Sequence, residues 1–300
     1  MRLAFTKMQG AGNDFVVIEP QNAEIDWNHL ALAVCNRHYG VGADGLLVLS
    51  PSRVADIRMR IFNADGSEAS ACGNGTRCVA KYCVEHHPTS STDGRITIET
   101  LSGVRGAWYL EGGEKSGQVR IAMGVPVVGV PLANHRERGK NGLDIAHQRI
   151  TVRGMSLELE LISLGNPHAV HFTESSLADF PVSEIGKVLD LQVFRGGVNF
   201  EVARVVNRRC IEARVWEHGV GETLACGSGA CSIAVAAHLK KAIDSHVEVC
   251  LPGGPLSVEW DGRGEVFLTG PAQTVFQGEW VDVEAGELEA SSPIKNEVLA

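Results

Sequence analysis

The sequence lacks several features that would assign it to a common functional class. No long uninterrupted apolar run occurs in its 300 residues, so we expect no membrane span. Residues 1–14 lack the apolar core of a secretory signal, which favours a cytoplasmic location. Positive charge is not in excess, and the formal net charge of −9 argues against nucleic acid or an anionic membrane as the partner.

Familiar cofactor and metal motifs are also missing. The chain has neither a P-loop pattern nor an HExxH helix. The spacing of Cys72, Cys78 and Cys83 does not match a paired zinc motif. We therefore expect no cofactor and no metal, and we expect the eight cysteines to be reduced thiols.

Two similar Cys-Gly loops are the most distinctive feature that is present. They read ACGNGTRC at 71–78 and ACGSGAC at 225–231. Four segments recur in the same order: 11–17 with 164–170, 26–37 with 183–192, 61–75 with 215–229, and the helix-like runs 76–86 with 230–242. Strand-like alternation of apolar and polar residues occurs at 58–62, 95–99, 156–164, 201–207 and 210–216. The pattern indicates an internal duplication into two α+β domains of similar topology.

Each loop combines a thiol with glycines at the start of a predicted helix. The free NH groups and the helix dipole stabilise a thiolate there, which predicts a lowered thiol pKa. The glycines let NH groups close around an anion such as a carboxylate. For a single loop, a helix cap with a buried cysteine would be the better explanation, but two matching loops in matching halves weaken it.

If the two halves face each other, their thiols flank a cleft from opposite sides. A carboxylate held by the NH groups would leave its α-carbon between the sulfurs. One thiolate would then remove the α-hydrogen while the opposite thiol protonates the other face. The arrangement predicts inversion of a stereocentre by two bases, with the NH donors stabilising charge on the carboxylate oxygens.

Several long motifs resemble the diaminopimelate epimerase family. They span Lys7 to about Pro271, and they are GAGNDF (10–15), NRHYGVGADGL (36–46), RIFNADGSEASACGNGTRC (60–78), GNPH (165–168), EHGVGETLACGSGA (217–230) and LPGG (251–254). The resemblance implies two halves related by a pseudo-two-fold axis, each a mostly antiparallel sheet curled around a central helix. The expected division is 1–124 with about 272–284, then 125–271, followed by a mobile tail at 285–300.

The resemblance also implies roles for particular residues and a small amino-acid substrate, with interconversion of LL- and meso-diaminopimelate on the route to lysine and peptidoglycan. The two catalytic bases would be Cys72 and Cys226, assisted by Glu217 and His168. The implied substrate-binding residues are Asn13, Asn63, Gly73, Asn74, Asn166, Asn199, Glu217, His218, Gly227 and Ser228. The resting thiolate and the oligomeric state, with a homodimer considered, are left open.

His218 departs from the family pattern, in which Arg follows the equivalent of Glu217. The family's Arg is implied to grip the distal carboxylate of the substrate, and an imidazole lacks its permanent charge and forked geometry. The alternative is therefore racemisation of another amino acid, such as histidine, by the same mechanism.

Two explanations outside this class remain to be tested. A thiol–disulfide oxidoreductase would account for paired reactive cysteines, although such enzymes usually carry both in one CxxC motif. A non-catalytic anion-binding module would use the glycine loops without needing the sulfurs.

Two thiols that share one α-carbon are close enough to be oxidised to a disulfide, which needs Cα atoms within about 7 Å. We expect oxidants to inactivate the protein reversibly through a Cys72–Cys226 bond. Peptide mass spectrometry of the inactive protein checks this, and finding both thiols free would refute it.

Overall fold

The structure is a computed structural model that describes residues 2–20, 25–70, 72–87, 94–112, 116–129, 147–194 and 196–281. The tail predicted at 285–300, and residues 282–284 before it, lie outside the described residues. No helix in these described ranges is both long enough and apolar enough to cross a membrane.

Most elements are strands, as the alternation in the sequence predicts. The first group contains β1 (Arg2–Gly10), β2 (Asn13–Ile18), α1 (Trp27–Val34), β3 (Gly45–Ser50), β4 (Ile57–Asn63), β5 (Glu68–Ala69), α2 (Gly73–His86), β6 (Arg95–Thr100), β7 (Gly103–Gly112), β8 (Ser116–Gly124) and β9 (Val127–Val128). The second group contains β10 (His147–Val152), β11 (Met155–Ser163), β12 (Pro167–Phe172), α3 (Val182–Val188), the π-helical turn η1 (Leu189–Val193), β13 (Asn199–Asn207), β14 (Cys210–Glu217), β15 (Gly221–Thr223), α4 (Gly227–Leu239), β16 (His246–Leu251), β17 (Gly254–Glu259) and β18 (Val266–Val281).

The first group of strands forms a closed sheet. Its pairings run in the order β1, β2, β3, β4, β6, β7, β8 and β18, and β18 pairs again with β1. Helix α2 packs against six of these strands, namely β1, β2, β6, β7, β8 and β18. Its residues Cys78, Val79 and Ala80 have no exposed surface, because the sheet covers the helix on several sides.

The second group repeats the same order of pairings. Strand β11 pairs with β12, followed by β13, β14, β16, β17 and β18, and β9, which continues from β8, pairs with β11. Each group has two parallel contacts at matching places, β2–β3 and β4–β6 in the first and β12–β13 and β14–β16 in the second. Helix α4 packs against β11, β12, β13, β16, β17 and β18. The duplication predicted from the loops therefore extends to the strand pairings.

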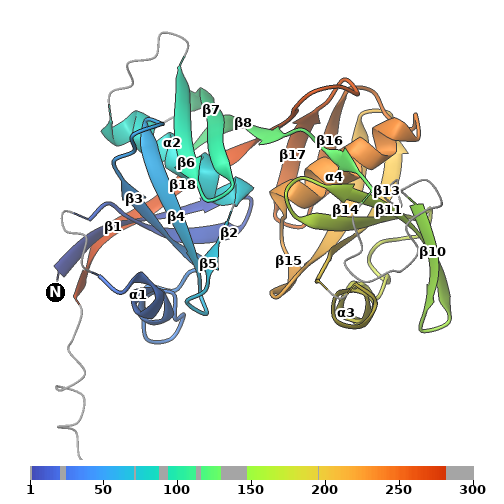
Figure 1. The fold of residues 1–300 in the computed structure, drawn as a ribbon, viewed down its shortest axis with the longest axis horizontal. Helices are drawn as coiled ribbons and strands as arrows, with labels where there is room; N and C mark the ends of the chain where they lie inside the picture. Colours follow the sequence, from blue (N-terminus) through green and yellow to red (C-terminus); the bar gives the residue numbers. More distant parts are fainter. Residues whose placement is uncertain are drawn as a thin grey trace, which may run out of the picture.

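Strand β18 joins the two groups, which form separate lobes side by side in Figure 1. Its first residues pair with β17 and its last with β1, while β8 lies along its first half. Helices α2 and α4 each lie within one lobe, and α1 and α3 lie on the same side of the molecule. Because β18 pairs with strands of both lobes, a movement of one lobe relative to the other would distort this strand.

A second contact between the lobes is made by two turns. Gly253 donates its NH to the carbonyl of Leu224 at 2.8 Å, and it lies directly against Ala11. A Cβ at Gly253 would lie 2.0 Å from the carbonyl oxygen of Ala11, so only glycine fits without movement.

We expect Gly253→Ala to lower the free energy of unfolding by about 1–3 kcal/mol, because the added methyl group forces the turns apart. Urea-induced unfolding measures the change. Gly196→Ala is the matched control, because a Cβ there meets no atom within 4 Å. If Gly253→Ala and Gly196→Ala have the same free energy of unfolding, the two turns can move apart without destabilising the protein.

Candidate active site

Cys72 is the N-cap residue of α2, as the loop pattern predicts. Its backbone is extended, and its sulfur accepts a hydrogen bond from the NH of Gly75 at 3.3 Å. The Cys72 thiol also lies 3.9 Å from Oδ1 of Asn13. A small side chain with an acceptor atom suits this position, because the first NH groups of a helix have no intrahelical partner.

Cys226 has the equivalent position on α4. Its sulfur accepts from the NH of Gly229 at 3.4 Å and lies 3.5 Å from the hydroxyl of Ser228. The first turns of both helices therefore direct NH groups at a sulfur. The difference is that Cys72 is partly accessible, whereas Cys226 is only 4% exposed.

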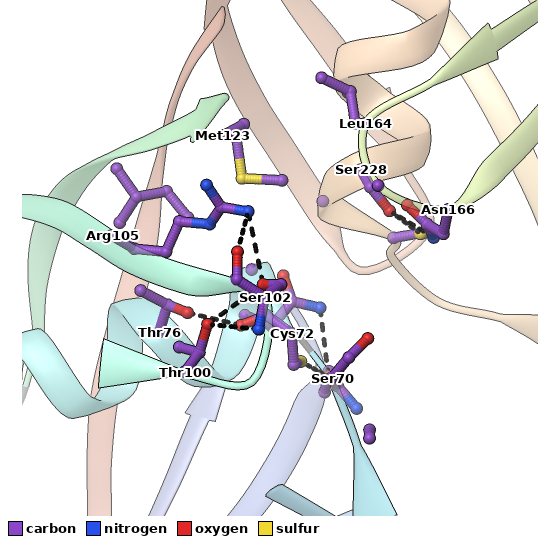
Figure 2. A pocket seen from close by; sticks show the side chains of 18 of the residues that line it. Ser70, Cys72, Thr76, Thr100, Ser102, Arg105, Met123, Leu164, Asn166 and Ser228 are labelled. Carbon is purple, nitrogen blue, oxygen red and sulfur yellow. Dashed lines mark hydrogen bonds between the residues drawn. The ribbon is translucent and has the colours of Figure 1, made fainter. Parts of the chain in front are cut away.

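Both thiols line one cavity of about 420 Å³ between the two lobes. In Figure 2, Cys72 and Arg105 border it from the first lobe, and Asn166 and Ser228 border it from the second. Of the residues predicted for the site, those on the cavity wall are Asn13, Cys72, Gly73, Asn74, Asn166, Glu217, Cys226, Gly227 and Ser228.

The N-termini of α2 and α4 meet at the base of this cavity. A Cβ built on Gly227 would lie 3.7 Å from the Cα of Gly73. The side-chain amide of Asn74 donates to the carbonyl of Ala225 and to Oδ1 of Asn13, both at 3.2 Å. The two helix ends therefore share a small volume, and their first NH groups can serve one anion.

Four predicted residues, Asn63, His168, Asn199 and His218, do not line the cavity. Asn63 donates to the hydroxyl of Ser67 at 3.0 Å at the end of β4. Asn199 donates to the carbonyl of Pro167 and accepts from the NH of His218, both at 3.0 Å. In this structure, the Asn63 amide therefore binds a side-chain hydroxyl, and the Asn199 amide binds two backbone groups.

His168 lies one layer behind the cavity wall. Its Nδ1 is 2.7 Å from Oε1 of Glu201, and its Nε2 is 3.1 Å from Oδ1 of Asn166. Both His168 and Glu201 are completely buried, and burial raises the pKa of the Glu201 carboxyl. Since Asn166 lies on the wall, His168 is in contact with the cavity wall through the Asn166 amide.

Glu217 ends β14 and faces both thiols. Its Oε1 accepts a hydrogen bond from the hydroxyl of Thr223 at 2.5 Å. Burial raises the pKa of Glu217, and its charge in turn acts to raise the pKa values of Cys72 and Cys226. A carboxylate beside two thiols disfavours a thiolate on either of them.

The prediction of a lowered thiol pKa is wrong for this structure. Burial raises the pKa of Cys72 to about 11 and that of Cys226 well above its usual value. The NH groups of Gly75 and Gly229 lower these pKa values but do not offset the loss of hydration.

His218 turns away from the cavity towards η1. Its Nδ1 lies 2.6 Å from Oδ1 of Asp190, a buried carboxylate that also accepts from Val198 and Trp216. The imidazole covers Gly197, where an added Cβ would fall within 2.2 Å of the ring. His218 is thus held by Asp190, although half of its side chain is exposed.

The cavity wall also includes residues that the sequence analysis did not identify. They are Glu68, Ala69, Ser70, Thr76, Thr100, Ser102, Arg105, Ile121, Ala122, Met123, Leu164 and Gly165. The repeat contained a signal for Glu68, because it aligns with Glu222 and the two halves therefore carry a glutamate at the same position before each Cys-Gly loop. Arg105, which donates to the carbonyl of Ser102 at 3.2 Å, comes from β7, where no motif marks it. Within the described ranges, no group of three or more His, Cys, Asp or Glu residues is arranged to hold a metal ion.

We expect His168→Leu to lower the free energy of unfolding by about 3 kcal/mol, because it leaves Glu201 buried without its partner. Adding Glu201→Leu should recover part of this loss, and urea-induced unfolding measures both. His147→Leu, which breaks a half-exposed contact with Glu160, is the control and should change stability by less than about 0.5 kcal/mol. If His168→Leu were as stable as His147→Leu, the expectation that His168 stabilises the buried Glu201 carboxylate would be wrong.

Solved structures share this fold at low sequence identity. A hydroxyproline epimerase from Agrobacterium vitis is 14% identical, covers 93% of this chain and 92% of its own, and superposes with a TM-score of 0.69. A phenazine biosynthesis protein of the PhzF family from Bacillus anthracis is 16% identical, covers 94% of this chain and 100% of its own, and has a TM-score of 0.65. These likenesses establish the fold and leave the substrate open.

Sequence relatives are more informative. The family described as diaminopimelate epimerase matches residues 5–128 and 161–275. A diaminopimelate epimerase from Desulfovibrio desulfuricans is 41% identical over 93% of this chain and 98% of its own, and one from Methanococcus maripaludis is 36% identical over 92% and 99%. The chain therefore belongs to the diaminopimelate epimerase family and is an isomerase.

Proposed function

We propose that this protein interconverts LL- and meso-diaminopimelate, with Cys72 and Cys226 as a paired base and acid. The observation that carries the proposal is that both thiols cap their own helices on the wall of one cavity. The names of relatives at 36–41% identity support the substrate. These names favour diaminopimelate over the alternative of histidine, which the experiment below includes.

The proposal treats the chain as two halves related by a pseudo-two-fold axis, each a sheet curled around its own helix, α2 or α4. We assign 1–124 with about 272–284 to one half and 125–271 to the other. The recurring order of strand pairings supports this division. A substrate centre between the halves would then meet the same chemistry from either side, which suits a reaction whose substrate and product differ only in configuration.

The α-carboxylate of the substrate would bind at the meeting point of the two helices. The NH groups of Gly73, Asn74, Gly227 and Ser228 precede the first intrahelical hydrogen bonds, so they are the donors that an anion can use. When the α-proton leaves, charge moves onto the carboxylate oxygens. Preorganised donors stabilise that charge most strongly in a site from which water is excluded.

Proton transfer in this proposal is balanced. The thiolate of one cysteine takes the α-proton and becomes a thiol, while the other thiol protonates the opposite face and becomes a thiolate. The substrate is neither oxidised nor reduced, so the cycle needs no redox cofactor, and in this proposal the NH donors at the carboxylate stabilise the carbanion in place of an electron-sink cofactor. Exchange with solvent then restores the starting protonation state.

The remaining predicted residues take supporting roles in the proposal. Asn13 and Asn166 lie beside the two helix ends and would bind the amino and carboxylate groups of the substrate. Glu217 would assist proton transfer at the thiols, and His168 would support Asn166. Asn63, Asn199 and His218 would need the cavity to change shape before they reach a ligand. A cytoplasmic location and a homodimer stay predictions.

In heavy water, purified protein should exchange the α-hydrogen of LL-diaminopimelate for deuterium as meso product forms. Cys72→Ser and Cys226→Ser should each lower the rate by about 100- to 10,000-fold, the usual contribution of a general acid or base. Mass spectrometry and chiral chromatography follow both events.

Cys210→Ser is the matched control, because Cys210 lies on β14 away from the cavity wall, and it should keep normal activity. If deuterium enters histidine but not diaminopimelate, the proposed substrate is wrong and the proposed two-cysteine mechanism still holds. Full activity in both catalytic variants would overturn the mechanism itself.

A further inference from the structure

Arg77 is a buried cation one turn beyond Cys72 on α2. None of its surface is exposed, and burial lowers the pKa of its guanidinium. Its Nη2 donates to Oδ1 of Asn74 at 2.9 Å and its Nε donates to the carbonyl of Pro271 at 3.2 Å. Its Nη1 is buried and has no hydrogen-bond partner among the described residues. Burying a charge is costly unless the charge is paired and fully hydrogen-bonded, so a buried guanidinium with one unsatisfied nitrogen indicates a functional role.

The backbone around Arg77 leaves room for this guanidinium. A Cβ at Gly10, the end of β1, would lie 3.2 Å from Nη2, and a Cβ at Gly270 on β18 would lie 3.1 Å from Nε. Two neighbouring strands thus lack side chains where the guanidinium lies. The site is shaped for Arg77 at the place where β18 passes from one lobe to the other.

Arg77 is connected to both thiols through Asn74. The oxygen of the Asn74 amide accepts from Arg77, so its nitrogen is left to donate to Ala225 and Asn13. Ala225 directly precedes Cys226 in the chain. Arg77 therefore fixes the orientation of the amide that joins the two helix ends.

The duplication does not repeat this cation. In the alignment of the two loops, Cys72 corresponds to Cys226 and Arg77 corresponds to Cys231, a buried neutral residue. The charged groups that act on Cys72 are Arg77 and Glu217, while Glu68 and Arg105 border the same cavity. Those that act on Cys226 are Glu217 and Glu201, with His168 behind Glu201.

We propose that Arg77 is a positioning residue that makes the two thiols unequal, so that Cys72 gives up its proton before Cys226 does. Its cation stabilises a thiolate at Cys72, and two carboxylates oppose a thiolate at Cys226. A nearly symmetric site thereby holds one base and one acid rather than two equal thiols. The role of this asymmetry in catalysis rests on the proposed function.

Alkylation by iodoacetamide between about pH 8 and pH 12 tests the proposal, because only the thiolate reacts and burial raises the pKa of Cys72 to about 11. Quantitative peptide mass spectrometry gives a rate and a titration midpoint for each cysteine. In the wild-type protein, Cys72 should titrate at lower pH and react roughly tenfold faster than Cys226, the effect of one pKa unit. A lower midpoint for Cys226 would overturn the proposal.

Two variants separate charge from access to the cavity, since access alters the rate but not the midpoint. Arg77→Met should raise the midpoint of Cys72 by about one pH unit, and Arg77→Lys, which keeps the charge, should keep the wild-type order. Lys81→Met removes another buried cation from α2 and should leave the Cys72 midpoint unchanged. An unchanged midpoint in Arg77→Met, or a reversed order in Arg77→Lys, would refute the role of Arg77.

Circular dichroism shows whether each variant folds. If Arg77→Met fails to fold, the order of the two titration midpoints in the wild-type protein and in Arg77→Lys still tests the proposal. Alkylation needs no substrate, so a protein that shows the predicted order but no exchange into diaminopimelate would refute the proposed function and leave this inference intact.

Discussion

The junction between the first turns of α2 and α4 is the constraint on which the rest of the site depends. Each helix packs against the strands of its own lobe, and this packing restricts the movement of its N-cap cysteine. At the junction, Gly73 faces Gly227, and the Asn74 amide reaches across to Ala225. Because strand β18 belongs to both lobes, the distance between the thiols is set by the whole fold rather than by either loop.

Burial that positions the thiols also makes them weaker acids. The backbone NH groups of Gly75 and Gly229 partly compensate, and the carboxylate of Glu217 acts against them. The opposing effects of the NH groups and of Glu217 explain why uncharged donors suit this cavity. Such donors stabilise a developing anion without adding a competing fixed charge. Of the two guanidinium groups at the site, that of Arg77 lies behind the wall and cannot bind the substrate directly, whereas Arg105 lines the cavity.

Duplication has preserved topology more closely than chemistry. The strand pairings match in order and in direction, whereas Asn74 and Arg77 of the first half correspond to Ser228 and Cys231 of the second. The residue at 218 is a further difference from the family pattern, and its imidazole is paired with Asp190 instead of facing the cavity. The guanidinium that does reach the wall belongs to Arg105, on the opposite lobe.

The repeat, five of the strands, the helices and the two N-cap cysteines could be predicted from the sequence, because these depend on local periodicity and on loops of a few residues. The sequence also identified the residues next to the thiols, since Gly73, Asn74, Gly227 and Ser228 are their neighbours in the chain. Which distant side chains face the cavity could not be predicted, because it depends on how the strands are packed around the helices. Thr100, Ser102 and Arg105 reach it because β6 ends and β7 begins beside the loop that precedes α2, while His218 pairs with a buried carboxylate instead. The acidity of the thiols was decided in the same way, because hydration depends on all the atoms packed around a sulfur and not on the helix that it caps.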